Sequence, residues 1–302
     1  MDATAKGDGQ SGSLDSADDV EAASQSPDAT TDDAVVSGPD AMDAKDLDVA
    51  VDGRADADAA DIDALVDTGI DGGTVVDAAD AAPLVDAADA AATLGIGLVA
   101  FYPFDETGGT TAADLSGNGF TAAMKGATFA PGQRGNAATM APGQYVSLPS
   151  GIVSGLTSCS ISLWVKLVTV PTFTRIFDFG TGTTAYMYLS PNTNVPDTRF
   201  AITLGGLTQE QQLRTTTLPT GTWKHIAIAL SGATGTLYVN GIQVTSSAVT
   251  LTPASLGTTT QNFIGRSQYA ASTTLDGQVD EFRIYGRVLT AAEIQQLFQL
   301  QM

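Results

Sequence analysis

Two tyrosines on one predicted strand are the side chains best suited to binding a ligand. Tyr186 and Tyr188 alternate with Met187 and Leu189, so both tyrosines share one strand face and point outward if the other pair enters the core. Aromatic rings stack against sugar rings, and arginine and amide groups bind the surrounding hydroxyls. The candidate ligand-binding residues are Tyr186, Tyr188, Arg199, Arg214 and Asn192. The alternative is that the tyrosines only pack against neighbouring strands.

A second group of side chains has the oxygen chemistry of a calcium site. Calcium takes about six to eight oxygen ligands, from carboxylates and from backbone carbonyls in loops. Asp280 and Glu281 on a late strand, Asp105 on an early one, and Asp114 and Asn118 in a loop would supply them if the two chain ends pair in one sheet. Strand alternation sends Asp280 and Glu281 to opposite faces, so only one would be a ligand. Alternatively, Asp114 and Asn118 form an ordinary Asx turn and Glu281 pairs with an arginine on the surface.

The residues that could act in catalysis do not form a recognisable catalytic pattern, and the sequence predicts no enzyme. His225 is the one histidine and shares a strand face with Trp223, which is typical of a core residue; no Gly-x-Ser-x-Gly motif accompanies it. Cys159 is the one cysteine and precedes an apolar strand, where it packs as a small side chain. Glycoside hydrolysis needs two carboxylates on either side of the scissile bond. Asp178 stands alone on its strand. A pair of carboxylates from distant segments, brought together by folding, is the alternative.

The elements that position these residues are predicted to be strands. About a dozen short strands are predicted between residues 98 and 285, but none between residues 105 and 143. Glycine, proline and asparagine separate them, and two-residue alternation is clear in 161–166. Asn240-Gly241 between two β-rich runs predicts a type I′ hairpin. One helix follows, because Thr290 and Glu293 form a capping box ahead of an apolar stripe. This pattern predicts a two-sheet antiparallel sandwich with a short C-terminal helix.

Charge divides the chain into two parts. Residues 1–95 hold 24 of the 34 acidic residues, three basic residues and no aromatic residue, and thus account for the whole net charge of −21. Such a segment cannot bury enough apolar area to fold, so we expect residues 1–95 to be a disordered Asp/Ala-rich acidic tail or spacer. Residues 96–302 carry all 20 aromatic residues and are predicted to form one domain.

The charge balance also limits the partners. The predicted domain has no excess of basic residues, and the tail would repel phosphate, so we expect no binding to nucleic acid. No apolar run approaches the length of a membrane span. The N-terminus, Met1-Asp2-Ala3-Thr4-Ala5-Lys6, lacks the apolar core of a signal peptide. Either the protein is not exported or the true start lies upstream.

Over residues 96–300 the chain resembles the laminin G-like jelly-roll domains of the concanavalin A-like lectin and glucanase superfamily. Six segments in the order of that family carry the resemblance. They are residues 99–106 (VAFYPFDE), 114–119 (DLSGNG), 161–166 (ISLWVK), 223–227 (WKHIA), 237–241 (LYVNG) and 277–285 (GQVDEFRIY). Residues 1–95 show no such resemblance.

The resemblance implies two curved antiparallel sheets, often a bound Ca²⁺, and a recognition or adhesion role that is commonly directed toward glycans. Related folds use the Asp corresponding to Asp280 as a metal ligand, so the metal candidates are ranked Asp280, Asp105, then Asp114 and Asn118. The Glu-x-Asp-x-Glu run of the glucanase branch is absent here.

The function predicted from the sequence is therefore a non-catalytic module that binds polysaccharide or glycoprotein glycans, secreted or displayed at the cell surface on its acidic spacer. The alternatives are a structural or protein-adhesion domain without glycan binding and a divergent glycosidase.

Overall fold

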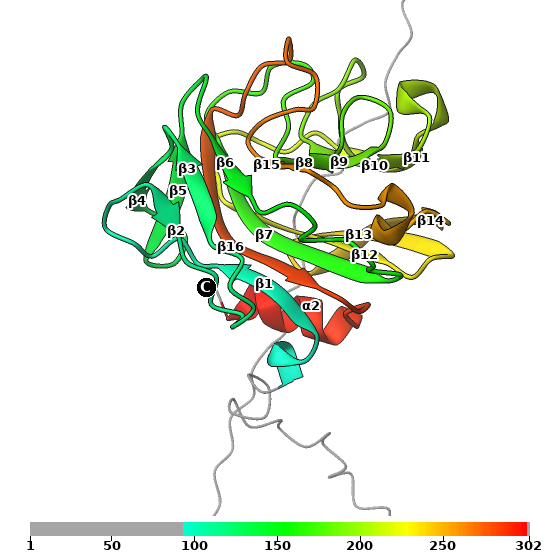
Figure 1. The fold of residues 1–302 in the computed structure, drawn as a ribbon, viewed down its shortest axis with the longest axis horizontal. Coiled ribbons are helices and arrows are strands. Elements are labelled where there is room, and N and C mark those ends of the chain that lie inside the picture. Colours follow the sequence, from blue (N-terminus) through cyan, green and yellow to red (C-terminus); the bar gives the residue numbers. More distant parts are fainter. Residues whose placement is uncertain (1–92, 301–302) are drawn as a thin grey trace, which may run out of the picture. The chain divides into compact units, whose positions relative to one another are not determined.

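The computed structural model describes residues 93–300, which form two eight-stranded sheets packed face to face (Figure 1). All strand pairs in both sheets are antiparallel. The predicted all-β jelly-roll sandwich is thus confirmed. The predicted acidic tail lies outside the described residues up to residue 92.

The first sheet joins the early and late parts of the folded chain. Its order is β14-β13-β12-β7-β16-β5-β4, and β1 also pairs with β16. The strands are β1 Leu98–Tyr102, β4 Thr128–Pro131, β5 Asn136–Met140, β7 Cys159–Leu167, β12 Lys224–Leu230, β13 Thr234–Val239, β14 Ile242–Ala248 and β16 Gly277–Tyr285. The pairing of β1 with β16 meets the condition set for bringing Asp105 near Asp280.

The second sheet has the order β11-β10-β9-β8-β15-β6-β3-β2. Its strands are β2 Thr111–Ala112, β3 Ala122–Lys125, β6 Tyr145–Leu148, β8 Phe177–Gly180, β9 Tyr186–Ser190, β10 Asp197–Thr203, β11 Gln211–Thr216 and β15 Gln261–Ile264. Two short 3₁₀ helices lie in connections: η1 (Gly206–Gln209) between β10 and β11, and η2 (Pro253–Leu256) between β14 of the first sheet and β15 of the second.

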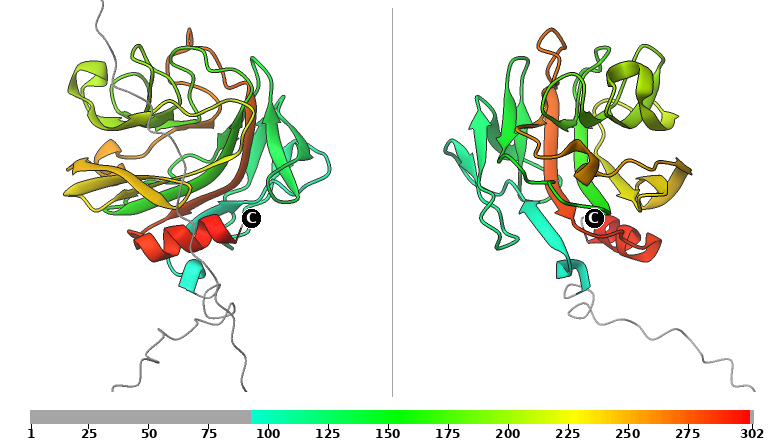
Figure 2. Two further views of the ribbon diagram at one scale, coloured as in Figure 1. Left: turned by 180° about the vertical axis from the view of Figure 1, so that it is seen from behind. Right: turned by 45° about the vertical axis from the view of Figure 1, so that its right-hand side comes forward.

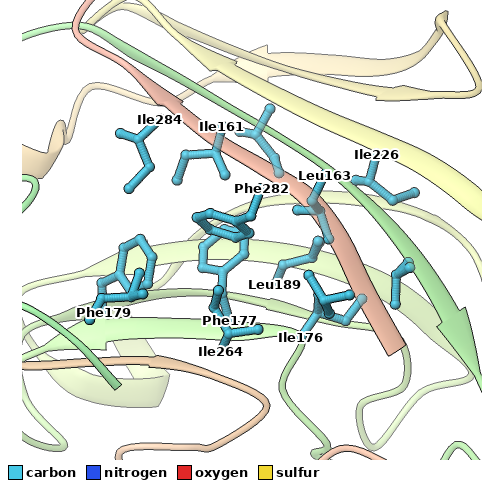
Figure 3. Close-up of a cluster of buried hydrophobic side chains, with 14 of the residues drawn as sticks. Ile161, Leu163, Ile176, Phe177, Phe179, Leu189, Ile226, Ile264, Phe282 and Ile284 are labelled. Atoms are coloured by element: carbon cyan, nitrogen blue, oxygen red, sulfur yellow. The ribbon is translucent and has the colours of Figure 1, made fainter. Parts of the chain in front are cut away.

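The core lies between the inner faces of the two sheets. Alternate residues of β7, such as Ile161 and Leu163, meet Phe177 and Phe179 of β8 and Phe282 of β16 (Figure 3). The rings of Phe177 and Phe282 meet edge to face, with centroids 6.0 Å apart. Because strand residues alternate between faces, the remaining residues of β7 and β9 are presented on the outer faces, where the sites described below are built.

The hairpin and the helix form as predicted. Asn240 and Gly241 have φ angles of 51° and 77° between β13 and β14, as a type I′ turn requires. Helix α2 (Ala291–Gln299) begins with a capping box: Thr290 Oγ1 accepts from Glu293 N at 3.2 Å, and Thr290 N donates to Glu293 Oε2 at 2.7 Å. The helix lies against the outer face of the first sheet (Figure 2).

Packing of the described domain starts upstream of its first strand. Leu94 is buried with Leu289 and Leu297 against the first sheet. The Arg287 guanidinium donates to the carbonyls of Thr93 at 3.1 Å and Ile96 at 2.7 Å. These contacts fasten the beginning of the domain to its C-terminal helix.

Candidate functional site

The two tyrosines singled out in the sequence lie on the outer face of the second sheet, as the alternation predicted. Met187 and Leu189 enter the core, and Tyr186 and Tyr188 point the other way. The expected exposure is wrong, however, because both rings are buried. The loop between β15 and β16 covers them: Tyr269 packs edge-on against Tyr186, with centroids 5.9 Å apart. This coverage comes from a residue 83 positions later in the chain.

Both tyrosine hydroxyls bind one buried carboxylate, that of Glu210. Tyr186 Oη donates to Glu210 Oε1 and Tyr188 Oη to Oε2, each at 3.2 Å. Arg199 lies 3.7 Å from the same carboxylate. Burial raises the pKa of Tyr188 to about 12, so the hydroxyl stays protonated and serves as a donor. Tyr186, Tyr188, Arg199 and Glu210 therefore form a hydrogen-bonded cluster, which we call the platform.

Arg175 and Asp178 form a second buried pair beside this platform. Arg175 Nε lies 3.5 Å from Asp178 Oδ2, and the guanidinium carbon lies 3.6 Å from the centroid of the Tyr188 ring. Burial raises the pKa of Asp178 to about 7, although the nearby Arg175 charge acts against this rise. Asp178 Oδ1 has no hydrogen-bond partner among the described residues.

Asp178 also holds the covering loop in place. Its Oδ2 accepts from Gln268 N at 3.1 Å, and Gln268 Nε2 donates to Gln261 O at 2.8 Å. Ser267 Oγ then accepts from Tyr269 N at 3.1 Å, which closes a short turn. A buried carboxylate on β8 thereby fixes where the Tyr269 ring lies.

A pocket of about 340 Å³ opens above Arg175. Three connections that lie far apart in the sequence meet there: the β7–β8 loop, η1 and the β15–β16 loop. The lining residues are Thr172, Phe173, Arg175, Leu207, Tyr269, Ala271, Ser272 and Thr273. In Figure 1 the β15–β16 loop, in orange, lies on the side of the sandwich opposite α2. Two aromatic rings, a guanidinium and several hydroxyls thus converge on one cavity.

Phe173 is held at the rim in an unusual backbone conformation. Its φ is +64°, in the left-handed region that is costly for a residue with a large side chain. Phe173 N donates to Asn192 O at 2.9 Å, and Arg175 Nη1 donates to Phe173 O at 3.3 Å. Phe173 as a whole is 37% exposed. The surrounding bonds thus present an apolar ring to solvent at the mouth of the pocket.

The other predicted ligand residues lie around this site in different roles. Arg199 is buried at the platform, and Arg214 lies 3.2 Å from Asp197 at its edge. Asn192 donates through Nδ2 to Val170 O at 2.9 Å and supports the loop that carries Phe173. Their binding roles stay predictions. Arg175, Phe173 and Tyr269 were not identified from the sequence, since only the fold brings their loops together.

The metal candidates Asp280 and Asp105 converge on one turn, the connection between β4 and β5. Asp280 Oδ2 accepts from Gln133 N and Arg134 N, each at 2.9 Å. Asp105 Oδ1 accepts from Asn136 N at 2.9 Å. Burial raises the pKa of Asp280 to about 7, and its Oδ1 is buried without a partner among the described residues. An orphaned carboxylate oxygen of this kind fits a cation ligand.

The alternation expected for Asp280 and Glu281 is interrupted by a β-bulge. Pairing between β16 and β7 shifts between Asp280 and Arg283, and Val279 and Phe282, three positions apart, both enter the core. Glu281 has a φ of +53° and pairs with Arg283. The alternative for Glu281 was an ion pair with an arginine on the surface; the ion pair forms, with Arg283, but the surface location is wrong because both side chains are largely buried.

Asp114 and Asn118 form a turn of their own. Asp114 accepts from the backbone N–H groups of Phe101, Ser116 and Phe120 at 2.9–3.0 Å, while Asn118 Nδ2 donates to the carbonyls of Leu98 and Val99. Burial acts to raise the pKa of Asp114, but these hydrogen bonds outweigh it and lower the pKa. Within residues 93–300, no three acidic, histidine or cysteine side chains gather as a metal site. A metal role for Asp114 and Asn118 stays a prediction.

His225 and Cys159 are packed side chains, as predicted. His225 is buried beside Trp164, with its Nε2 2.8 Å from Ser162 Oγ, and burial lowers its pKa to about 3. Cys159 lies in the core, and burial raises the pKa of its thiol to about 12.

Residues 140–295 match the family model Laminin_G_3, described as the concanavalin A-like lectin/glucanases superfamily. The chain belongs to this family. The match covers β6 through most of α2 and includes every residue that lines the pocket. No curated protein matches the chain.

Several solved structures share this fold. Domain 4 of AbnA, a GH43 extracellular arabinanase from Geobacillus stearothermophilus solved with arabinotriose, is 27% identical over 67% of this chain and 98% of that domain, with a TM-score of 0.59. The binding domain of botulinum neurotoxin serotype C1 (15% identity, 69% of this chain and 53% of that one, TM-score 0.53) shares the fold. The Trypanosoma rangeli sialidase solved with sialic acid also shares the fold, at 20% identity over 68% of this chain and 33% of that one, with a TM-score of 0.53. This chain spans about half of the toxin binding domain and a third of the sialidase.

Proposed function

We propose that this domain is a non-catalytic carbohydrate-binding module whose ligand lies in the pocket between Phe173 and Tyr269. The observation that carries the proposal is the lining itself. Two partly exposed aromatic rings flank a buried guanidinium, and Thr172, Ser272 and Thr273 supply hydroxyls at the edge. This combination of apolar faces and a few fixed polar groups is the one that sugars require.

The charges of the site favour a neutral sugar. Arg175 pairs with Asp178, Arg199 with Glu210 and Arg214 with Asp197. The cations of the platform are therefore already balanced, and a ligand has hydroxyls rather than charges to offer them. The similarity to an arabinanase domain solved with arabinotriose supports the same ligand class, the glycan chain of a polysaccharide or glycoprotein.

A binding role is favoured over hydrolysis by the positions of the acidic residues. Among the described residues, the pocket lining includes no carboxylate. Asp178, Asp197 and Glu210 are in ion pairs with arginines. Glycoside hydrolysis needs two carboxyl groups that reach the scissile bond, and buried, paired side chains do not offer them.

A structural Ca²⁺ is the second part of the proposal. Asp280 and Asp105 would hold it at the β4–β5 turn, with backbone carbonyls completing the ligand set. When bound, the ion would neutralise the buried Asp280 carboxylate and link β16 to the segment that follows β1.

We also propose an extracellular location, secreted or at the cell surface. The arabinanase that contains the similar domain is extracellular, and a glycan ligand is abundant there. Within the part of the chain that the structure describes, no helix is long and apolar enough to cross a membrane.

The direct test is affinity electrophoresis of the full chain in gels that contain arabinan or other neutral polysaccharides. We expect retardation of the wild type and at least about tenfold weaker binding for Tyr269→Ala and Phe173→Ala, since each removes an aromatic contact. Val288→Ala, a change at a 40% exposed residue outside the pocket, is the matched control. Unretarded wild-type protein would overturn the proposal in favour of a protein-adhesion domain, and unchanged binding by both pocket variants would move the site elsewhere.

A further inference from the structure

Two more aromatic side chains lie on the outer face of the second sheet, on the neighbouring strands β6 and β15 (Figure 1). Val146 and Ile264 enter the core, so Tyr145 and Phe263, which precede them, face outward. Their rings meet edge to face, with centroids 5.5 Å apart and planes at 83°. Both residues are partly exposed, and neither lines the proposed sugar pocket.

The guanidinium of Arg266 lies over these two rings. Its central carbon is 4.7 Å from the centroid of the Tyr145 ring and 5.1 Å from that of the Phe263 ring, within the range of a cation–π interaction. Arg266 is partly exposed, and within residues 93–300 its side chain forms no ion pair or hydrogen bond. The rings thus position the guanidinium while its N–H donors stay available to a ligand.

Lys125 places a second cation on the same face. It lies opposite Tyr145 in the register of β3 and β6, and Met124 before it enters the core. Because residues opposite each other in an antiparallel pair share a face, the Lys125 side chain extends outward beside Tyr145. The residue is exposed.

No carboxylate balances these two cations within the described residues. Neither Lys125 nor Arg266 takes part in an ion pair there. Strands β3, β6 and β15 contain no acidic residue. Asp178, which lies opposite Phe263 on β8, is already paired with Arg175. Positive charge without a partner at an exposed aromatic surface favours a negatively charged ligand.

The basic aromatic patch consists of Lys125, Tyr145, Phe263 and Arg266. We infer that this patch is a second carbohydrate site, which takes an acidic sugar unit with its carboxylate on Arg266. The inference rests on the proposed glycan-binding function and extends it to a charged unit. A guanidinium binds a carboxylate through paired N–H donors, and the partly exposed rings offer apolar faces to the sugar. An acidic peptide would use the charges of the patch but not its rings.

Calorimetric titration of the full chain with trigalacturonate tests the inference. Fully methyl-esterified trigalacturonate, which has the same sugar rings without the charges, should bind at least about tenfold more weakly. Arg266→Gln and Tyr145→Ala should each weaken trigalacturonate binding at least about tenfold, and Lys125→Gln should weaken it several-fold. Lys166→Gln makes the same change in net charge on the first sheet and should have little effect.

Further arms separate the patch from the pocket. Arg266→Lys keeps the charge and should bind trigalacturonate better than Arg266→Gln, which guards against a folding defect. Phe173→Ala should reduce arabinotriose binding and leave trigalacturonate binding unchanged, and Arg266→Gln should do the reverse. Loss of arabinotriose binding alone would overturn the pocket and leave the patch supported by its own ligand.

Three results would overturn the acidic-sugar site. The first is that the wild type does not bind trigalacturonate, or binds its methyl ester equally well. The second is wild-type affinity in both Arg266→Gln and Tyr145→Ala. The third is binding of an oligo-aspartate peptide as tight as that of trigalacturonate and equally sensitive to Arg266→Gln, which would assign the patch to acidic protein segments.

Discussion

Asp178 is buried, and its environment resists the charged form. Its partners are Arg175, the backbone of Gln268 and, at 3.5 Å, Ser267 Oγ. Burial dominates and raises the pKa of the carboxyl to about 7, above its value of 3.8 outside the fold. The folded protein therefore holds this proton more tightly than the unfolded chain does.

The sign of the resulting pH dependence follows from linkage. Because the folded pKa is raised, Asp178 contributes stability that is fully present below about pH 4 and is lost as the pH rises through about 7. The loss has a slope of up to about 1.4 kcal/mol per pH unit. Urea unfolding of wild type and Asp178→Asn between pH 4 and 8 measures it. As the pH rises over this window, we expect the free energy of unfolding of the wild type to fall relative to that of Asp178→Asn. A constant difference between the two proteins would contradict the assignment.

Asp280 gives a prediction about calcium. If Asp280 and Asp105 hold the ion, chelation with EDTA should lower the melting temperature of the wild type by a few degrees, because binding to the folded state stabilises it. Asp280→Ala should abolish the difference between calcium and EDTA buffers. Asp276→Asn, which removes a carboxylate from the loop that leads into β16, should retain that difference. Identical melting of the wild type in both buffers would exclude the site.

At the scale of elements, the C-terminal helix depends on its first turn. Thr290 and Glu293 exchange hydrogen bonds, and Glu293 also binds Arg287 at 2.6 Å. We expect Thr290→Ala to reduce the free energy of unfolding by about 1 kcal/mol. Thr184→Ala, at an exposed loop position, should have little effect. Chemical denaturation of both variants checks this, and an equal effect of the two changes would contradict it.

The sequence predicts the elements whose side chains alternate clearly and misses those whose side chains are small. Residues 161–166 show the alternation, and β7 is found there. Strands β2 to β5, between residues 111 and 140, are short and rich in alanine and threonine, so they carry no such pattern. The bulge at Asp280 was missed for a related reason: a bulge inserts one residue without changing residue types, so strict alternation was the default expectation.

The candidate site shows a second limit of prediction from the sequence. Alternation placed Tyr186 and Tyr188 on the outer face correctly. It carried no information about the loop of Tyr269, which covers them from far along the chain. The pocket joins three connections, and a contact between loops depends on the whole topology rather than on local sequence.

At the scale of the whole molecule, residues 93–96, ahead of the first strand, pack against the described domain. Leu94 is 7% exposed, and Arg287 binds the carbonyls of Thr93 and Ile96. We expect a fragment of residues 93–302 to keep the melting temperature of the full chain, since all aromatic residues lie within it. A fragment of residues 97–302 should lose about 2 kcal/mol or more, because burial of Leu94 is removed. Calorimetry compares the two fragments, and equal stability would contradict the role of this segment.

The central claim is that a sugar occupies the pocket between Phe173 and Tyr269. A crystal structure of the protein with arabinotriose, or with the neutral glycan that binds best in the electrophoretic screen, tests it most directly. We predict density for a sugar ring against these aromatic side chains, with a hydroxyl within hydrogen-bond distance of Arg175. Density for the glycan at another surface, with this pocket empty, would contradict the claim.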